Sequence, residues 1–129
     1  MPKLSQFSKD NLKLCDEQLV QLFEAVAVIV DIRIVTGHRD ELAQGQAFLT
    51  GHSKKAWPDS NHNKIPSKAV DVVPFPIDWE DKARFYFMAG VIKAVASWMG
   101  VRIRGGYDWD SDGDFKDQTF NDLAHFELI

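Results

Sequence analysis

Residues 69–104 have the sequence AVDVVPFPIDWEDKARFYFMAGVIKAVASWMGVRIR, and this stretch contains the patterns of a strand, a long helix and a second strand. Ala69 to Phe75 is a short apolar run interrupted by proline, which predicts a strand that ends there. Asp78 is a good N-cap for the following helix, and Gly100 ends it. Val101 to Arg104 predicts the second strand. Apolar residues at helical spacing predict one buried stripe along the helix, formed by Phe85, Met88, Ile92, Val95 and Met99.

Helical and strand patterns also flank this stretch. Asp16 to Val28 predicts a helix, and the β-branched residues from Asp31 to Val35 predict a strand. Asp40 to Thr50 predicts a short helix, and Ala124 to Leu128 predicts a final strand. The two long polar loops are residues 52–68 and 105–118. Together these elements predict an α+β fold in which a small, mainly antiparallel sheet is covered by helices.

Length and composition are those of one folded domain. The chain has 129 residues, of which 45% are hydrophobic and 26% are charged. These values are typical of a single globular domain and exclude a disordered chain. We therefore expect one domain over residues 1–129 and a monomer. Cys15 is the only cysteine, which excludes an internal disulfide and a multi-cysteine zinc site.

Charge and hydropathy exclude two classes of partner. The formal net charge is −4 and Lys and Arg form no dense cluster, so we do not expect nucleic-acid binding. The longest apolar run, Ala25–Val30, is far shorter than the ~18–20 residues of a membrane span. The segment from Met1 to Asp10 is polar and unlike a signal peptide. The sequence thus predicts a protein that is made and folded in the cytosol.

Two of the four histidines occur with acidic residues in a pattern that suits zinc. A catalytic zinc ion takes about three protein ligands from His, Asp or Glu and keeps a position open for water, whose pKa it lowers. His62, Asp71 and His125 supply such a set of two nitrogens and one oxygen. Asp122 lies three residues before His125, where its carboxylate can serve as a general base. The spacing alone leaves an alternative open, in which Asp71 ends a strand and Asp122 forms a turn.

Short motifs from Thr36 to the C-terminus follow the order found in a known enzyme family. The central pair, Ser60–Asn61–His62 and Ala69–Val70–Asp71, resembles the Ser-x-His and Ala-x-Asp motifs of the M15 zinc peptidases. That family includes D-alanyl-D-alanine dipeptidases and carboxypeptidases and the phage L-alanyl-D-glutamate endolysins. The further matches are Gly37–His38–Arg39, Gln44, Gly51–His52–Ser53–Lys54, Gly105–Gly106–Tyr107–Asp108–Trp109 and Asp122–Leu123–Ala124–His125–Phe126–Glu127–Leu128.

The resemblance implies a role for individual residues. It implies zinc ligands at His62, Asp71 and His125 and the catalytic base at Asp122. It also implies a fold like that of the hedgehog and D,D-peptidase group. The guanidinium of the Gly-x-Arg motif would bind substrate or stabilise the oxyanion, because it stays charged and presents fixed donors. The residues placed at the substrate are Arg39, Gln44, Ser60 and Trp109.

The implied activity is that of a zinc peptidase acting on the peptide stem of bacterial peptidoglycan. The base is Asp122 rather than Glu, as in the phage endolysins, which favours hydrolysis of the L-alanyl–D-glutamate bond and lysis of the host. Eight residues separate His62 from Asp71, with Ser67 where glycine is usual, and this resembles a phage and prophage variant with a longer loop. Such an enzyme is expected in the host cytoplasm, from which it would reach the wall after holin-mediated release.

Two alternative functions remain at this point. One is a D-alanyl-D-alanine carboxypeptidase of the same family, which would differ in the shape of its cleft. The other is a metal-bearing but inactive module that binds the cell wall. The presence of all four expected residues, His62, Asp71, Asp122 and His125, argues against the inactive module.

An acidic loop provides a separate candidate metal site. Asp108, Asp110, Asp112 and Asp114 match the start of an EF-hand calcium loop, Asp-x-Asp-x-Asp-Gly. Thr119 stands at the twelfth position, where a bidentate Glu is expected, which argues against a complete EF-hand. The sequence leaves two interpretations, a regulatory Ca²⁺ site near the cleft and an acidic loop that is simply solvated.

Overall fold

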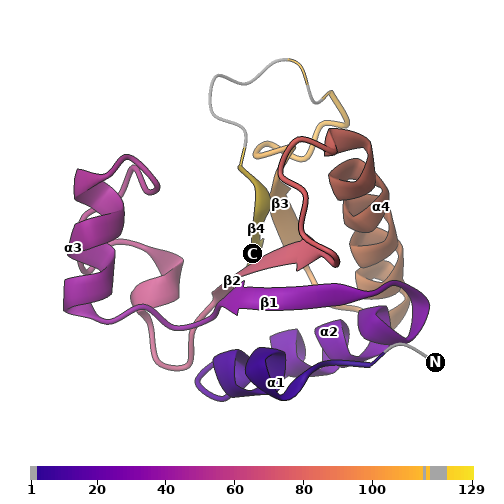
Figure 1. The fold of residues 1–129 in the computed structure, drawn as a ribbon, viewed down its shortest axis with the longest axis horizontal. Helices are drawn as coiled ribbons and strands as arrows, with labels where there is room; N and C mark the ends of the chain where they lie inside the picture. The colour runs from indigo at the N-terminus through magenta and orange to yellow at the C-terminus, as the bar shows by residue number, and fades with distance from the viewer. Residues whose placement is uncertain (1–2, 115, 117–121) are drawn as a thin grey trace.

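The computed structural model describes residues 3–114, 116 and 122–129, and its architecture is α+β (Figure 1). Within these residues, one antiparallel sheet has the strand order β1-β2-β4-β3. The predicted fold class is therefore confirmed. Its strands are β1 (Ile32–Thr36), β2 (Ala69–Pro74), β3 (Ile103–Gly106) and β4 (Asp122–Leu128), and its helices are α1 (Gln6–Leu12), α2 (Glu17–Ile29), α3 (Glu41–Leu49), α4 (Lys82–Met99) and the 3-10 helix η1 (Asn61–Asn63).

The sheet has two chemically different faces, because side chains alternate along each strand. Val70 and Val72 of β2, together with Phe126 of β4, belong to the hydrophobic core. Asp71 and His125, which are partners in the β2–β4 ladder, belong to the opposite face. The same two strands therefore supply the core on one side and the candidate site on the other.

Helices α2 and α4 cover the apolar face of the sheet. The N-cap of α2 is Asp16, as predicted, and its carboxylate accepts a hydrogen bond from the backbone of Gln18. The rings of Phe23 in α2 and Phe126 in β4 meet edge to face, with centroids 6.4 Å apart. The predicted stripe of α4 is buried at Phe85, Met88, Ile92 and Val95. No helix in the described part of the chain has both the length and the apolar character needed to cross a bilayer.

The start of α4 differs from the prediction. The helix begins at Lys82, and its N-cap is Asp81, whose carboxylate accepts a hydrogen bond from the backbone of Arg84. Asp78 accepts a hydrogen bond from the backbone of Glu80 instead, within a turn that precedes the helix. Two aspartates three residues apart can each cap a turn, and the later one starts the helix here.

The end of α4 also shifts the next strand. Gly100 has the left-handed backbone conformation (φ 72°) that suits glycine, and the Val101 N–H donates to the carbonyl of Ala96. Val101 thus completes the helix terminus, and β3 begins at Ile103 instead of at Val101. Met99, in the last turn, is 39% exposed and is not part of the buried stripe.

Helix α1 is absent from the prediction because its sequence is polar and lacks an apolar stripe. Ser5 caps it, and its buried Ser8 fastens it to the sheet by accepting a hydrogen bond from the backbone of Ile34 at 3.0 Å. At the other end of the chain, Gln118 and Thr119 of the predicted acidic loop lie outside the described residues.

Helix α3 stands apart from the sheet, next to η1 (Figure 1). Its apolar side chains are largely exposed, with Leu49 at 84%, and its one buried residue is Gln44. The Gln44 amide donates to the Ser53 hydroxyl (3.0 Å) and to the Lys55 carbonyl (2.6 Å). We call residues 41–56 the α3 lobe, and polar contacts rather than an apolar core organise it.

Candidate metal centre

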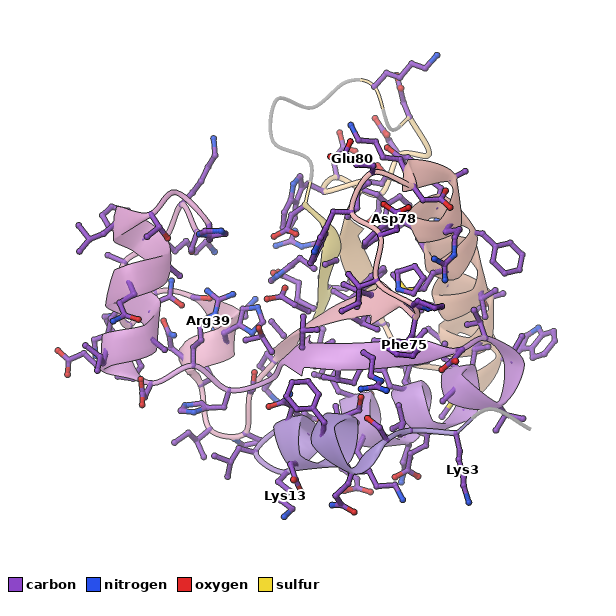
Figure 2. All side chains as sticks on the ribbon, in the orientation of Figure 1. Lys3, Lys13, Arg39, Phe75, Asp78 and Glu80 are labelled. Carbon is purple, nitrogen blue, oxygen red and sulfur yellow. The ribbon has the colours of Figure 1, made fainter. Side chains whose placement is uncertain are left out.

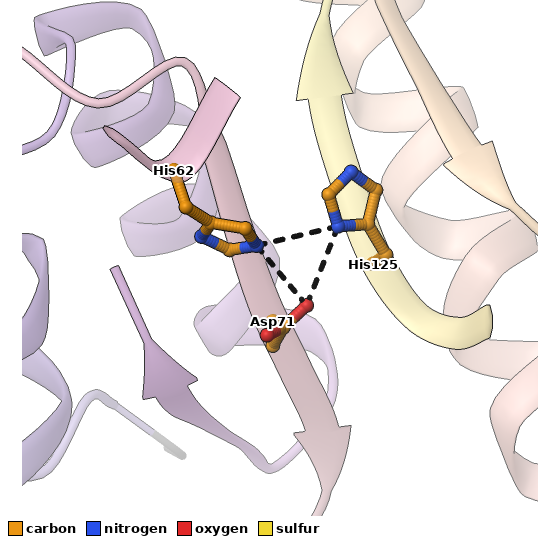
Figure 3. A group of neighbouring side chains, drawn as sticks. All are labelled: His62, Asp71 and His125. Carbon is orange, nitrogen blue, oxygen red and sulfur yellow. Dashed lines mark hydrogen bonds and ion pairs between the residues drawn. The ribbon is translucent and has the colours of Figure 1, made fainter. Parts of the chain in front are cut away.

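Three side chains from separate elements converge on the open face of the sheet (Figure 3). His62 lies in η1, Asp71 in β2 and His125 in β4. Ser60 caps η1 and accepts a hydrogen bond from the His62 backbone, which fixes the start of this short helix. The distance from His62 Nε2 to His125 Nδ1 is 3.3 Å, and Asp71 Oδ1 lies 3.5 Å from each of these nitrogens. The predicted ligand set is therefore brought together, and we call it the ligand cluster.

The distances within the ligand cluster fit a tetrahedral ion. With bonds of about 2.0–2.1 Å, two ligands of a tetrahedral zinc ion lie about 3.3–3.4 Å apart. The observed 3.3, 3.5 and 3.5 Å correspond to three edges of such a tetrahedron. Among the described residues, no fourth His, Cys, Asp or Glu joins this group. The protein thus supplies three corners and leaves the fourth for solvent or substrate.

Hydrogen bonds from the outer nitrogens of His62 and His125 orient the two rings so that their inner nitrogens point to the centre of the ligand cluster. His62 Nδ1 donates to the Gly37 carbonyl and His125 Nε2 donates to the Glu127 carboxylate, both at 2.7 Å. A neutral imidazole has one N–H, so these partners leave the inner nitrogens as acceptors. Asp71 Oδ1 faces them, buried and without a hydrogen-bond partner. A cation between the three groups, a proton or a metal ion, removes their mutual repulsion, and their tetrahedral spacing fits a metal ion.

Protonation of the cluster depends on these close contacts. Burial acts to lower the pKa of His125, but the carboxylates of Asp71 and Glu127 outweigh burial and raise the pKa to about 9. Burial acts to raise the pKa of Asp71, but the His125 and His62 rings outweigh it and hold that pKa below its usual value. A metal ion can bind only after displacing the His125 proton, so metal affinity should increase with pH.

Glu127 orients His125 from behind, a role that the sequence analysis does not assign. Its second oxygen, Oε2, accepts hydrogen bonds from Arg104 (2.8 and 3.1 Å) and Asn61 (3.0 Å). Only 5% of the Glu127 side chain is exposed. Burial acts to raise the pKa of Glu127, but His125 and Arg104 outweigh it and lower that pKa to about 2. The signal in the sequence is the two-residue spacing, which places positions 125 and 127 on one face of a strand.

Arg39 connects the ligand cluster to the α3 lobe (Figure 2). Its guanidinium donates to Asp71 Oδ2 and to Gln44 Oε1, each at 3.1 Å, and its backbone N–H donates to the His62 carbonyl at 2.8 Å. Arg39 also lines the cleft, and the substrate or oxyanion role implied by the resemblance stays a prediction. The contacts assign it a further task, which is to hold the second oxygen of Asp71.

Gln44 and Ser60, for which the resemblance implies substrate contacts, are both buried. Gln44 is fully buried, and its amide oxygen accepts from Arg39 and from the Asn63 amide while its NH₂ group donates within the α3 lobe. With these contacts made, Gln44 positions Arg39, and its predicted role at the substrate stays a prediction. Ser60 lines the cleft, but it is buried and its hydroxyl is engaged by the His62 backbone.

Asp122 stands at the start of β4 and lines the same cleft as His125. Burial, with the negative charge of Asp71, raises the pKa of its carboxyl group. Its ladder partner is Gly106, where a Cβ atom would overlap the Asp122 carbonyl. Glycine thus allows the close approach that sets Asp122 in place. A carboxylate with a raised pKa suits the uptake and release of a proton.

Trp109 lies where the sequence predicts it, in the wall of the cleft over the ligand cluster. The cleft has a volume of about 240 Å³. The centroid of one Trp109 ring lies 5.2 Å from that of His125. An aromatic wall beside the cluster can pack against a substrate and limit access of water.

Three of the four acidic-loop residues come together. Carboxylate oxygens of Asp108, Asp110 and Asp112 lie within 4.8 Å of one another, whereas Asp114 accepts a hydrogen bond from the Lys116 backbone and lies outside this group. Asp108 is only 2% exposed, and its Oδ1 is buried without a hydrogen-bond partner. Partial desolvation and the neighbouring carboxylates raise the pKa of Asp110. We call these three residues the acidic cluster.

The geometry first indicates a class. Two imidazoles and a carboxylate with an open fourth corner, beside a second carboxylate of raised pKa, are typical of metal-dependent hydrolases. The family model described as phage L-alanyl-D-glutamate peptidase matches residues 1–129. The L-alanyl-D-glutamate peptidase of Escherichia phage T5 is 30% identical over 108 residues, which cover 79% of this chain and 74% of that protein. The chain therefore belongs to the phage L-alanyl-D-glutamate peptidase family.

A solved structure has the same fold. The crystal structure of the L-Ala D-Glu endopeptidase ChiX of Serratia marcescens matches with a TM-score of 0.75 at 23% identity, covering 96% of this chain and 87% of that one. At this identity the similarity concerns the fold. Family membership confirms the predicted peptidase and favours the L-alanyl–D-glutamate bond over the D-alanyl-D-alanine alternative.

Proposed function

We propose that this protein is a zinc-dependent endolysin of the M15 type that hydrolyses the L-alanyl–D-glutamate bond of the peptidoglycan stem and thereby lyses the host. Membership of the phage family supports the scissile bond. The zinc dependence is supported by one observation, the convergence of His62 Nε2, Asp71 Oδ1 and His125 Nδ1 at 3.3–3.5 Å, which is the spacing of three ligands of one tetrahedral ion.

The residues of the cleft have separate roles in the reaction. A bound zinc ion would supply the Lewis acid that activates water and polarises the scissile carbonyl. Asp122 takes a proton from the attacking water and passes it to the nitrogen of D-glutamate as the carbon–nitrogen bond breaks. Arg39 holds Asp71 and adds positive charge where the carbonyl oxygen becomes negative. The products are an alanyl carboxylate and a glutamyl amine.

Digestion of purified sacculi tests this proposal directly. Mass spectrometry should find new alanyl carboxyl ends and new D-glutamyl amines, only with metal present. Release of free D-alanine would instead support the carboxypeptidase, and binding to sacculi without cleavage would support the inactive module. His62→Gln should lose stoichiometric zinc, whereas His52→Gln, at an exposed histidine outside the ligand cluster, should keep it.

We also propose that the enzyme reaches the wall from the host cytoplasm after holin-mediated release. The phage origin of the family supports this route. Cells that express the protein alone should stay intact, and co-expression of a holin should lyse them. Lysis without a holin would contradict the route and leave the peptidase activity untouched.

For the acidic cluster we propose a Ca²⁺ site that regulates stability or activity. The supporting observations are the buried, unpartnered Oδ1 of Asp108 and the approach of carboxylate oxygens of Asp108, Asp110 and Asp112 to within 4.8 Å of one another. Saturating Ca²⁺ should raise Tm or change the rate of cleavage in wild type. Asp110→Asn should abolish this response, and Asp59→Asn, at an exposed residue of another loop, should keep it. No response to Ca²⁺ in wild type would refute the site.

A further inference from the structure

Two neighbouring cavities adjoin the ligand cluster, one lined by His62 and His125 and the other by Asp71, and we treat them as two halves of one cleft that differ in charge. The half lined by Lys54, Lys55 and Arg104 is here called the basic half. A neighbouring cavity of about 690 Å³ has no lysine among its described lining residues and is here called the neutral half. The residues that line both halves are Arg39, His52 and Asp122. A substrate that crosses the cluster therefore meets an excess of cations on one side, whereas on the other it meets Arg39 together with the carboxylates of Asp71 and Asp122.

Arg104 is held rigidly in the wall of the basic half. It is the cross-strand partner of Glu127, and its Nε and Nη2 both donate to Glu127 Oε2. No described residue accepts a hydrogen bond from Nη1, and 37% of the side chain is exposed. The Arg104 Cζ atom lies 6.0 Å from the centroid of Trp109. One edge of the guanidinium is thus anchored, which leaves another edge able to bind an anion.

Lys55 is held on the same cavity by its backbone. Its carbonyl accepts hydrogen bonds from the buried Gln44 amide (2.6 Å) and the Ser53 hydroxyl (3.2 Å), and its N–H donates to that hydroxyl (3.1 Å). Its side chain is exposed. The backbone of Lys55 is thus fixed at three points in the lining of the basic half, from which its flexible side chain can add positive charge to that of Arg104.

The substrate has the same asymmetry as the cleft. In an L-alanyl–D-glutamate bond, the amine of glutamate is part of the scissile amide. At most one of its two carboxyl groups can continue the peptide, so the leaving-group side keeps at least one further carboxyl group, which is negatively charged unless it is amidated. The alanyl side of the bond carries only a methyl group. Electrostatic complementarity therefore fixes the direction in which the substrate binds.

We propose that Arg104 and Lys55 bind the free carboxylate of the D-glutamyl residue, so that the leaving group occupies the basic half of the cleft and the alanyl residue occupies the neutral half. This inference rests on the proposed function, from which it takes its substrate. It makes Arg104 a residue with two partners, because one edge of its guanidinium holds Glu127 and the other edge selects the substrate.

The test uses two stem peptides that differ only at the D-glutamyl carboxyl group outside the peptide chain. One peptide has the free carboxylate, and the other has a carboxamide in its place. The kcat/KM values of the zinc-loaded enzyme should favour the carboxylate peptide by about tenfold or more, as expected for charge-assisted hydrogen bonds. Arg104→Gln should lose this preference mainly through KM, and Lys55→Gln should reduce it several-fold. Lys9→Gln removes the same charge from the exposed surface of α1 and should keep the wild-type ratio.

The ratio of the two kcat/KM values distinguishes loss of carboxylate binding from a general loss of activity. Loss of the Glu127 contact in Arg104→Gln would act through His125 and lower both rates equally, and the zinc content of each variant checks this. A ratio that stays at its wild-type value in both Arg104→Gln and Lys55→Gln would overturn the inference, while cleavage of the peptides would leave the proposed function standing. Failure of the zinc-loaded wild type to cleave either peptide would contradict both.

Discussion

Asp122 and Glu127 are two carboxylates of one strand whose surroundings give them opposite chemistry. Burial and the nearby Asp71 raise the pKa of Asp122, whereas the hydrogen bonds of Glu127 outweigh its burial and lower its pKa to about 2. Glu127 therefore stays ionised and holds His125, while Asp122 can accept a proton and release it. The pair shows how position within one strand separates a structural carboxylate from a reactive one.

Asp122→Asn should remove proton transfer and keep the metal. The amide has nearly the same shape but cannot act as a base, so kcat should fall by about 10²–10⁴-fold. Zinc affinity should stay within a few-fold of wild type, because Asp122 is outside the ligand cluster. Muropeptide cleavage and zinc titration measure the two effects. A variant that cleaves as fast as wild type would refute the assignment of the base.

Glu127→Gln should weaken metal binding. The neutral amide cannot support the His125 N–H as a carboxylate does, and loss of such a partner typically costs about 10–100-fold in metal affinity or activity. Competition with a chelating dye measures the affinity. Glu24→Gln, at an exposed glutamate of α2, makes the same change away from the site and should bind zinc as wild type does.

Residue types and motif order predict the roles of His62, Asp71, Asp122 and His125, because few kinds of side chain can bind a metal ion or transfer a proton. They do not predict the burial of Gln44, since an amide serves a ligand or a hydrogen-bond network equally well, and only the folded α3 lobe shows which. Burial decides these roles, and burial depends on elements far apart in the chain.

At the scale of the elements, β3 and β4 leave no room for a side chain at Gly106, the ladder partner of Asp122. Gly106→Ala would place a Cβ atom against the backbone of Asp122 and should destabilise the protein by about 1–3 kcal/mol, as overpacking does. Gly90→Ala, within α4 and with open space around it, should stabilise by about 0.5–1 kcal/mol because alanine is the better helix former. Urea unfolding measures both, and equal effects of the two variants would contradict the close approach.

Periodicity predicts α2, α4 and β2, because each has an apolar pattern that one face of the fold buries. It does not predict α1, whose residues are mostly polar and which is held on β1 by hydrogen bonds of Ser8 and Asn11 to the backbone of Ile34 and by the buried Leu12. The strand order is also absent from the local pattern. The one indication that β2 and β4 lie close together is the predicted ligand pair, Asp71 in β2 and His125 in β4, which are partners in the ladder.

For the whole molecule, the raised pKa of His125 predicts a dependence of stability on pH. A group whose pKa rises from 6.5 to about 9 on folding stabilises the protein fully below pH 6.5 and loses that contribution as pH rises through 9. The metal-free protein should therefore show a falling Tm over this range. Zinc should flatten the curve, because it takes the place of the proton. Scanning calorimetry with chelator and with zinc measures both curves, and identical slopes would contradict the prediction.

The alternation along β2 and β4 also links assembly of the ligand cluster to correct folding. A slip by one residue would turn Asp71 and His125 toward α2 and α4 and expose Val70 and Phe126 to water. Such a chain would bury a carboxylate among hydrocarbon and could not persist as a compact species. In a sample renatured from denaturant, the fraction of chains that retains one tightly held ion should therefore equal the fraction that has recovered native strand pairing, so metal analysis provides a measure of renaturation yield.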